Sequence, residues 1–501
     1  MSFGSIHIED GIIKNIGSSI ITPANVEVVD VDSAYIYPAF IATISHAGIK
    51  NVEKEKKTDV ARPGYPPNDV AGITPELSIA TSYAHADNSI KAFREAGFAI
   101  AHTVPKGGML PGKGSVVTLS GAPFDDSVIE QDMSLYAQFK GAERMFPATT
   151  IGVIAKWREL YKNAQIGHRY TMTYKANPSS KKRLQQDAAT KGLYPVVSNK
   201  IPVFFHTESA LDIFRALNLQ SELGFNIFLS EVKSGQKATK KVKRSNQPIL
   251  FSLDLPKEDE TKEDELNDEQ KVLLTKKKES ILASYQQVSD YVSMDIPFSF
   301  SYIDVKPKDI HDQVKTLIDH GLKEEDALKA MTIDAAKALQ IDNIVGSLER
   351  GKIANLVITT DTLFNDGNQI KTVFIDGIPH NLDIKTKKSN TIDPDVDFSG
   401  SYTYNIEIPG MMPSGKMTFV KNDDTYDILI TSDQAEGETY NATDVIIDGN
   451  TIEYDFTIQQ GGMTIPISNT ITIDSGSFEG EVTIPDFGSF PITAEKIDSP
   501  E

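Results

Sequence analysis

Residues 36–48 read Ile36-Tyr37-Pro38-Ala39-Phe40-Ile41-Ala42-Thr43-Ile44-Ser45-His46-Ala47-Gly48, and this stretch decides the fold. Its apolar run, Ala39-Phe40-Ile41, is typical of a short strand buried on both faces. The polar residues that follow include His46, which we expect at the tip of the strand. The stretch therefore predicts a buried strand that carries a histidine at its end.

The middle of the chain alternates between apolar runs and helical patterns. In the helix predicted at 208–222, Leu211, Phe214 and Leu217 are expected to face inward. Strand–helix–strand units build parallel sheets, and over about 250 residues the favoured closure is a (β/α)₈ barrel. The further predicted strands are 98–101, 201–205, 225–229, 248–251 and 298–300, and the further predicted helices are 88–95, 151–161 and 279–292.

Both flanks of this middle region carry hairpin signals. Asp10-Gly11 follows an alternating run, and Asp376-Gly377 follows Val373-Phe374-Ile375; both pairs favour type I′ turns. The two clusters indicate one small β domain made from residues 1–38 and 341–390, around a barrel at 39–340. The alternative is two unrelated hairpins.

Composition limits the class of protein. With 501 residues, the chain is long enough for two or three domains. It has no cysteine and no run of about 18 apolar residues, so we expect neither disulfides nor a membrane span. The net charge of −20 argues against nucleic acid as a partner.

Charge and pattern change near residue 395. Residues 401–501 hold 18 Asp and Glu against three Lys, a net charge of −15. Tyr402 and Tyr404, and later Tyr426, Ile428 and Ile430, repeat with period 2. We predict an acidic all-β domain at 395–501, with about eight strands in an up-and-down barrel or a sandwich.

A charged insertion interrupts the barrel pattern at 257–279. Eleven of the fifteen residues from 257 to 271 are charged. Such runs are usually solvated, so we predict a surface insertion. A docking tail is the alternative.

The strand at 36–48 resembles the first barrel strand of the amidohydrolase superfamily, P-G-F-I-D-x-H-x-H-x-G. Pro38, Phe40, Ile41, His46 and Gly48 match that pattern. Residues 326–339 and 346–357 are similar to the closing signature of the family, A-L-x-A-x-T-x-x-P-A-x-x-L followed by G-x-x-x-x-G-K-x-A-N-L-V. The resemblance covers about residues 5–380, and the run 94–112 is similar to the imidazolonepropionase-related bacterial branch.

The resemblance implies an amidohydrolase-like barrel, a split β-sandwich and one or two divalent metals, most simply Zn²⁺. His46 and His206 match the metal-binding histidines of strands 1 and 5. Glu231 and Asp304 are the nearest carboxylates at the ends of strands 6 and 8, and are the candidate catalytic residues. Ile44 and Ile303 stand where the family has a histidine and an aspartate, which makes the metal site degenerate.

Two lysines are candidates for binding a ligand. The stretch 107–113 fits G-x-x-x-x-G-K, but Gly114 replaces the Ser or Thr of a phosphate-binding loop, and a strand pattern follows it. We expect the glycines to shape a loop over the barrel mouth, where Lys106 or Lys113 contacts an anionic ligand.

Two functions stay open at this point. The first is metal-dependent hydrolysis of C–N bonds in small cyclic or linear amides. The second is a catalytically silent barrel that binds a ligand or a paralogous amidohydrolase-like partner. Relatives in this branch are commonly exported, which implies a periplasmic protein, although Met1–Glu9 lacks the pattern of a secretory signal.

Overall fold

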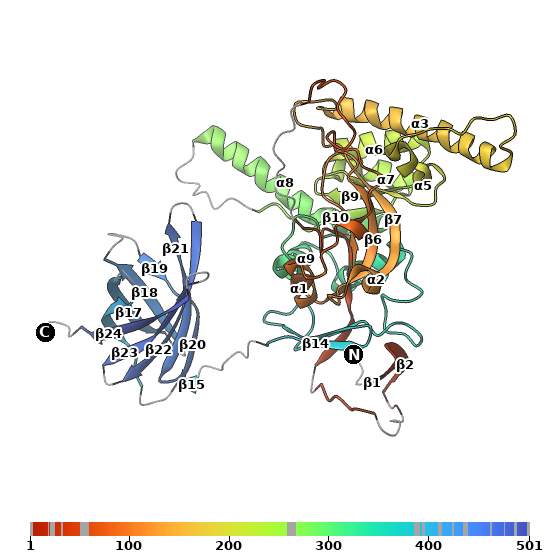
Figure 1. Cartoon of the computed structure of the whole chain (residues 1–501). Coiled ribbons are helices and arrows are strands. Elements are labelled where there is room, and N and C mark those ends of the chain that lie inside the picture. Colours follow the sequence, from red (N-terminus) through yellow and green to blue (C-terminus); the bar gives the residue numbers. More distant parts are fainter. Residues whose placement is uncertain are drawn as a thin grey trace. The chain divides into compact units, whose positions relative to one another are not determined.

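The computed structural model divides into two compact units, Met1–Ile384 and Lys385–Glu501 (Figure 1). Residues 258–266 of the charged insertion predicted at 257–279 lie outside the described residues, as do residues 393–395, next to the predicted start of the second domain. The structure describes residues 4–18, 20, 26–31, 34–50, 60–257, 267–384, 391–392, 396–408, 413–422, 425–433, 439–460, 463–474, 476–484 and 488–497.

The first unit is built on an eight-stranded sheet whose strands follow one another in chain order. The sheet curls until its two edges meet: Tyr302 N donates to Ile44 O at 3.0 Å, and the hydroxyls of Thr43 and Ser299 lie 2.6 Å apart. This near-closed barrel confirms the predicted fold. Its strands are β4 (Phe40–Ser45), β5 (Phe98–Thr103), β6 (Gly112–Thr118), β7 (Val128–Gln138), β8 (Val203–His206), β9 (Ile227–Val232), β10 (Ile249–Ser252) and β11 (Phe298–Ser301).

One strand departs from a regular (β/α)₈ barrel. β6 runs antiparallel to both β5 and β7, while the other neighbouring pairs are parallel. The chain turns directly from β5 into β6, so no helix separates them. The strand expected after Gly114 is confirmed, and this rules out the helix that a phosphate-binding loop requires.

Helices cover the outside of the barrel, as Figure 1 shows for α3, α6, α7 and α8. α6 begins where Ser209 Oγ accepts from Asp212 N and ends at Gly224, which has a φ of 83°. Leu217 is buried as expected. Leu211 is 55% exposed, so the prediction that it faces inward was wrong. The helices are α1 (Asn88–Glu95), α2 (Phe124–Ser127), α3 (Thr150–Ala176), α4 (Ala188–Gly192), α5 (Tyr194–Val197), α6 (Ala210–Leu223), α7 (Thr239–Ser245), α8 (Asp268–Ser293), α9 (Ile310–Asp319), α10 (Glu324–Met331) and α11 (Ile333–Ala338).

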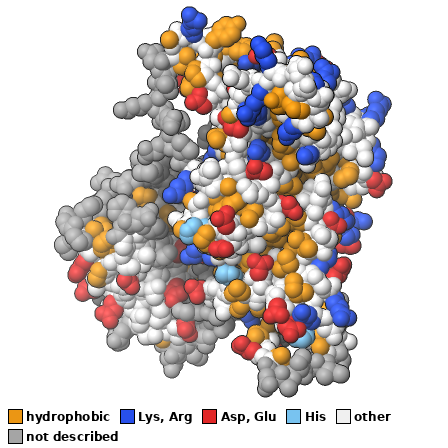
Figure 2. Space-filling model, turned by 45° about the vertical axis from the view of Figure 1, so that its right-hand side comes forward, with side chains coloured by type: hydrophobic (Ala, Val, Ile, Leu, Met, Phe, Trp, Pro, Cys, Tyr) orange, Lys and Arg blue, Asp and Glu red, His pale blue; other side chains and the backbone are white. Residues whose placement is uncertain are grey.

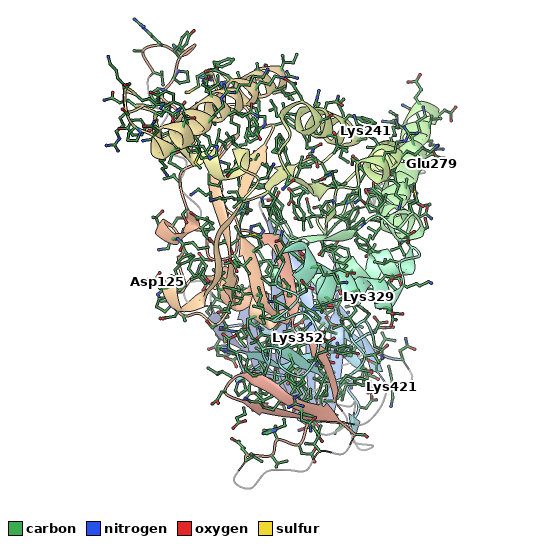
Figure 3. All side chains as sticks on the ribbon, turned by 90° about the vertical axis from the view of Figure 1, so that its right-hand side faces the viewer. Asp125, Lys241, Glu279, Lys329, Lys352 and Lys421 are labelled. Carbon is green, nitrogen blue, oxygen red and sulfur yellow. The ribbon has the colours of Figure 1, made fainter. Side chains whose placement is uncertain are left out.

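Two small sheets are separate from the eight-stranded sheet: β1 pairs with β2, and β3 from the amino-terminal flank joins β12, β13 and β14 from the other flank. β3 pairs with β12, and in this pairing Tyr37 lies opposite Val357. Asp10-Gly11 and Asp376-Gly377 both have positive φ at each residue, as type I′ turns require. Figure 3 places Lys352, just before β12, at the opposite end of this unit from Lys241 of α7. The strands are β1 (Ser5–Glu9), β2 (Ile12–Gly17), β3 (Tyr35–Pro38), β12 (Leu356–Thr359), β13 (Ile370–Ile375) and β14 (Ile378–Asn381).

The second unit is an up-and-down β structure with its own core. Its first long strand, β16, pairs with its last, β24, and β18 and β19 lie against β20 and β21. Among the described residues of this unit, nine strands are antiparallel and the short β15 adds a parallel edge, close to the expected number of about eight. The strands are β15 (Thr391–Ile392), β16 (Gly400–Ile406), β17 (Ser414–Asn422), β18 (Thr425–Ser432), β19 (Thr439–Asn441), β20 (Thr443–Gly449), β21 (Thr451–Gln460), β22 (Met463–Asp474), β23 (Ser477–Ile484) and β24 (Gly488–Lys496).

Acidic, basic and apolar side chains are interspersed on the face shown in Figure 2. No helix among the described residues is both long and apolar enough to cross a membrane.

The second unit should fold without the first. Its alternating residues, Tyr402, Tyr404, Ile452 and Tyr454 among them, bury one another in a core separate from that of the barrel. A fragment of residues 396–501 should give a β-rich circular dichroism spectrum and a cooperative thermal transition. A fragment that stays unfolded would mean that the barrel unit completes its core.

Candidate active site

Four predicted site residues gather at the carboxyl ends of the barrel strands. His46 follows β4, His206 ends β8, Glu231 lies near the end of β9, and Asp304 comes three residues after β11. The charges of His206 and Asp304 both act on His46, and those of His206 and Asp304 both act on Glu231. The barrel thus brings together side chains that are far apart in the sequence.

His46 is held as a neutral imidazole. Its Nδ1 lies 2.8 Å from Val104 O, just after β5. A carbonyl oxygen can only accept, so Nδ1 carries the proton and Nε2 keeps its lone pair. Burial lowers the pKa of His46 to about 4, and the charges of Lys106 and His206 act in the same direction.

His206 is engaged through both ring nitrogens. Nδ1 lies 3.0 Å from the hydroxyl of Tyr136 on β7, and Nε2 lies 3.2 Å from Glu208 Oε1. Burial alone would lower the pKa of His206. The hydrogen bond with Glu208 and the charges of Glu231, Glu208 and Asp304 outweigh burial and raise the pKa.

Glu231 sits in a bulge of β9. Leu229 and Val232 oppose Ile249 and Phe251 of β10, so β9 carries one residue more than its partner. Glu231 takes a φ of 59°, a conformation that costs a non-glycine residue about 1–3 kcal/mol. Bulges of this kind re-aim side chains and are common next to active sites.

The carboxyl of Glu231 is 1% exposed and accepts a hydrogen bond from Ser301 Oγ at the end of β11. Burial raises its pKa to about 7, although His206, Ser301 and Lys233 act to lower it. A carboxyl that titrates near neutral pH can take up a proton in one step and release it in another.

Asp304 also has a left-handed backbone, with a φ of 64°. Its side chain is exposed, and its negative charge acts on His46, His206 and Glu231. The mouth therefore holds one buried carboxyl and one exposed carboxylate.

The two predicted ligand-binding lysines differ in their surroundings. Lys106 is exposed, and its charge acts on His46. Lys113 Nζ lies 2.9 Å from Asp132 Oδ2, so its charge is already balanced. Binding of a ligand by either lysine stays a prediction.

The side chains at the mouth do not fit a divalent metal as they are arranged. Metal sites in proteins usually draw three or four donors from the chain. Among the described residues, no three His, Asp or Glu side chains form a group that could hold an ion. Ile44 is 0% exposed and Ile303 is 3% exposed, so buried hydrocarbon fills two positions where the family pattern has donors.

The sequence analysis missed Tyr136, Glu208 and Ser301. Glu208 lies two residues after His206, and Ser301 ends a predicted strand, so strand-end positions could have pointed to both. Tyr136 lies in the apolar run Leu135-Tyr136-Ala137 of β7. This strand was not predicted because the polar residues 130–132 interrupt its apolar pattern.

A second buried histidine lies one layer below the mouth. His102 Nδ1 is 2.9 Å from Thr43 O, so it carries the proton, and Ser134 Oγ donates to Nε2 at 2.7 Å. A Cβ at Gly114 would come 2.7 Å from Nε2, which explains the glycine there. Both side chains are fully buried, and each is the hydrogen-bond partner of the other in the barrel interior.

Glu231→Gln should change how stability depends on pH. The folded carboxyl titrates at about 7 and the unfolded one at about 4.5, so between these values the folded protein keeps a proton that the unfolded chain has lost. The free energy of unfolding of the wild type should fall by about 3 kcal/mol relative to the variant as pH rises through this window. Urea unfolding of both proteins at about pH 4 and about pH 8 measures this change in the free energy of unfolding.

Glu130→Gln is the matched control, because Glu130 is an exposed carboxylate on β7. Its effect on the free energy of unfolding should not vary across the same pH range. A Glu231→Gln effect that is equally flat would contradict the raised pKa.

Comparison with known proteins supports a family for the barrel unit. Residues 226–378 match the model of the Amidohydrolase family. An amidohydrolase structure from Thermotoga maritima MSB8 is 20% identical, with a TM-score of 0.61, and the match covers 75% of this chain and 94% of that one. This likeness shows the fold.

Two further solved structures are more distant. An amidohydrolase is 12% identical with a TM-score of 0.44, over 77% of this chain and 96% of that one. A prolidase complexed with N-methylphosphonate-L-proline is 13% identical with a TM-score of 0.43. That match covers 75% of this chain and 93% of that one. No curated protein matches the chain. The chain thus resembles the Amidohydrolase family over residues 226–378 and shares the fold of an amidohydrolase of known structure.

Proposed function

We propose that this protein hydrolyses a C–N bond in a small, non-peptide amide at the mouth of the barrel. The observation that carries the proposal is Glu231, a buried carboxyl in a strained bulge beside His206. Strained, buried ionisable groups at the mouth of a barrel are typical of catalytic sites.

In the proposed reaction, Glu231 carries the proton from water to the leaving nitrogen. Ionised Glu231 takes a proton from water as the water oxygen bonds to the amide carbon. The carbonyl oxygen gains negative charge, and in this proposal His206, held by Glu208 and Tyr136, stabilises that charge when its imidazole is protonated. Glu231 then returns the proton to the leaving nitrogen as the C–N bond breaks.

Asp304 has a supporting role in this proposal. Its exposed carboxylate would raise the proton affinity of both Glu231 and His206. No step is assigned to a metal, because the donors at the mouth do not fit one.

The substrate class follows from the sequence resemblance. The imidazolonepropionase-related branch points to small cyclic amides as the first compounds to test, with linear amides next. Lys106, whose charge acts on His46, would favour a substrate that carries a negative charge. Nucleic acid is disfavoured by the net charge of −20.

A second candidate is a catalytically silent barrel that binds a ligand or a paralogous partner. Ile44 and Ile303 favour it, because both put hydrocarbon at strand ends where the family pattern has metal ligands. A silent barrel gives no reason for a strained, buried carboxyl at the same mouth.

Glu231→Gln should abolish hydrolysis in a screen of lactams, imidazolones, hydantoins and linear amides. Loss of a general base lowers kcat by roughly 10²–10⁴-fold, and the shape of Gln leaves substrate binding nearly unchanged. Glu130→Gln should keep wild-type rates. Wild-type protein that binds a compound from the screen without turning it over would favour the silent barrel. Equal rates in wild type and Glu231→Gln would remove Glu231 from the mechanism.

A further inference from the structure

We infer that the barrel mouth works without a bound divalent cation, because hydrogen bonds within the chain already occupy the side chains that would hold one. The positioning unit that takes its place is Tyr136–His206–Glu208. The inference does not depend on the proposed reaction, since its tests measure metal content and stability.

His206 is the strongest part of the argument. A histidine binds a metal through the lone pair of one ring nitrogen, and its other nitrogen donates to a supporting group. Here Nδ1 faces the Tyr136 hydroxyl at 3.0 Å and Nε2 faces Glu208 at 3.2 Å. A metal at either nitrogen would have to break one of these contacts.

The other donors are too few. His46 offers Nε2 alone, because Nδ1 is used by Val104 O. Glu231 has one carboxyl oxygen bonded to Ser301 and is 1% exposed. One imidazole nitrogen and part of a buried carboxyl fall short of the three or four protein donors that a tight site needs.

Two apolar residues close the remaining positions. Ile44 is the last apolar residue of β4, and Ile303 comes two residues after β11; both belong to the packed core. Branched hydrocarbon cannot donate to a metal, and it excludes the water that would complete a coordination shell. The fold keeps the place of the family's site, while two of its donor positions carry apolar side chains.

The first test is metal analysis of the purified full chain after dialysis. We expect substoichiometric Zn, Mn, Fe, Co and Ni, and a melting temperature that chelator leaves unchanged. About one tightly held metal ion per chain, lost in both His46→Ala and His206→Ala, would overturn the inference.

The second test restores donors. Ile44→His with Ile303→Asp should give a protein whose melting temperature rises on addition of Zn²⁺, by several degrees at saturating metal. The matched control, Ile44→Val with Ile303→Val, makes the same two sites smaller without adding donors and should not respond. A wild-type response as large as that of the donor variant would contradict the inference.

A third measurement covers the case in which the donor variant does not fold. Tyr136→Phe and Glu208→Ala each remove one contact of His206, and their effects on the free energy of unfolding should be non-additive, because both act on the same imidazole. Chelator should leave the free energy of unfolding of both variants unchanged. Additive effects, or a metal content that falls in both variants, would argue for a cation at His206 instead.

Discussion

The meeting of β4 with β11 is the constraint on which the candidate site depends. The bond from Tyr302 N to Ile44 O and the contact of Thr43 with Ser299 hold the two edges of the eight-stranded sheet together. Closure directs the ends of β4, β8, β9 and β11 toward one mouth. It also removes water from the carboxyl of Glu231, and this desolvation is the largest cause of its raised pKa.

The site is therefore a product of burial more than of charge pairing. Glu231 has a serine hydroxyl as its bonded partner, and the positive charges near it only partly offset the loss of hydration. His206 shows the opposite balance, since Glu208 and the neighbouring carboxylates outweigh its desolvation. Burial thus favours the neutral form of Glu231, while the neighbouring groups favour the charged form of His206. Acid–base sites share this pattern of neighbouring groups with different charge states.

Local sequence predicted the elements well where one pattern dominated. Buried strands such as 98–101 and 201–205 appear as continuous apolar runs, and the period-2 residues of the second unit face its core. The β6–β7 hairpin was missed because the first half of β7, Val128–Asp132, is partly exposed and polar. Leu211 was wrongly predicted to face inward, because apolar residues in the first turn of a helix are often exposed to solvent.

The candidate site shows the limit of such reasoning. The family resemblance, carried onto the ends of the predicted strands, led to the expectation that His46, His206, Glu231 and Asp304 lie at one mouth. It could not reveal the bulge that turns Glu231 inward, nor the contacts that Tyr136 and Glu208 make with His206, because these depend on the register of neighbouring strands. The loss of metal donors was readable from Ile44 and Ile303, but the hydrogen bonds that occupy the remaining side chains were not.

The central claim is that closure of the barrel buries an ionisable carboxyl poised near neutral pH. The most direct test is a ¹³C NMR titration of the Glu side-chain carboxyls, with the Glu231 signal assigned by its loss in Glu231→Gln. The account predicts a midpoint of about 7 for this signal. A midpoint at the ordinary value for glutamate, near 4.5, would contradict it, since the carboxyl would then be hydrated and the mouth open to water.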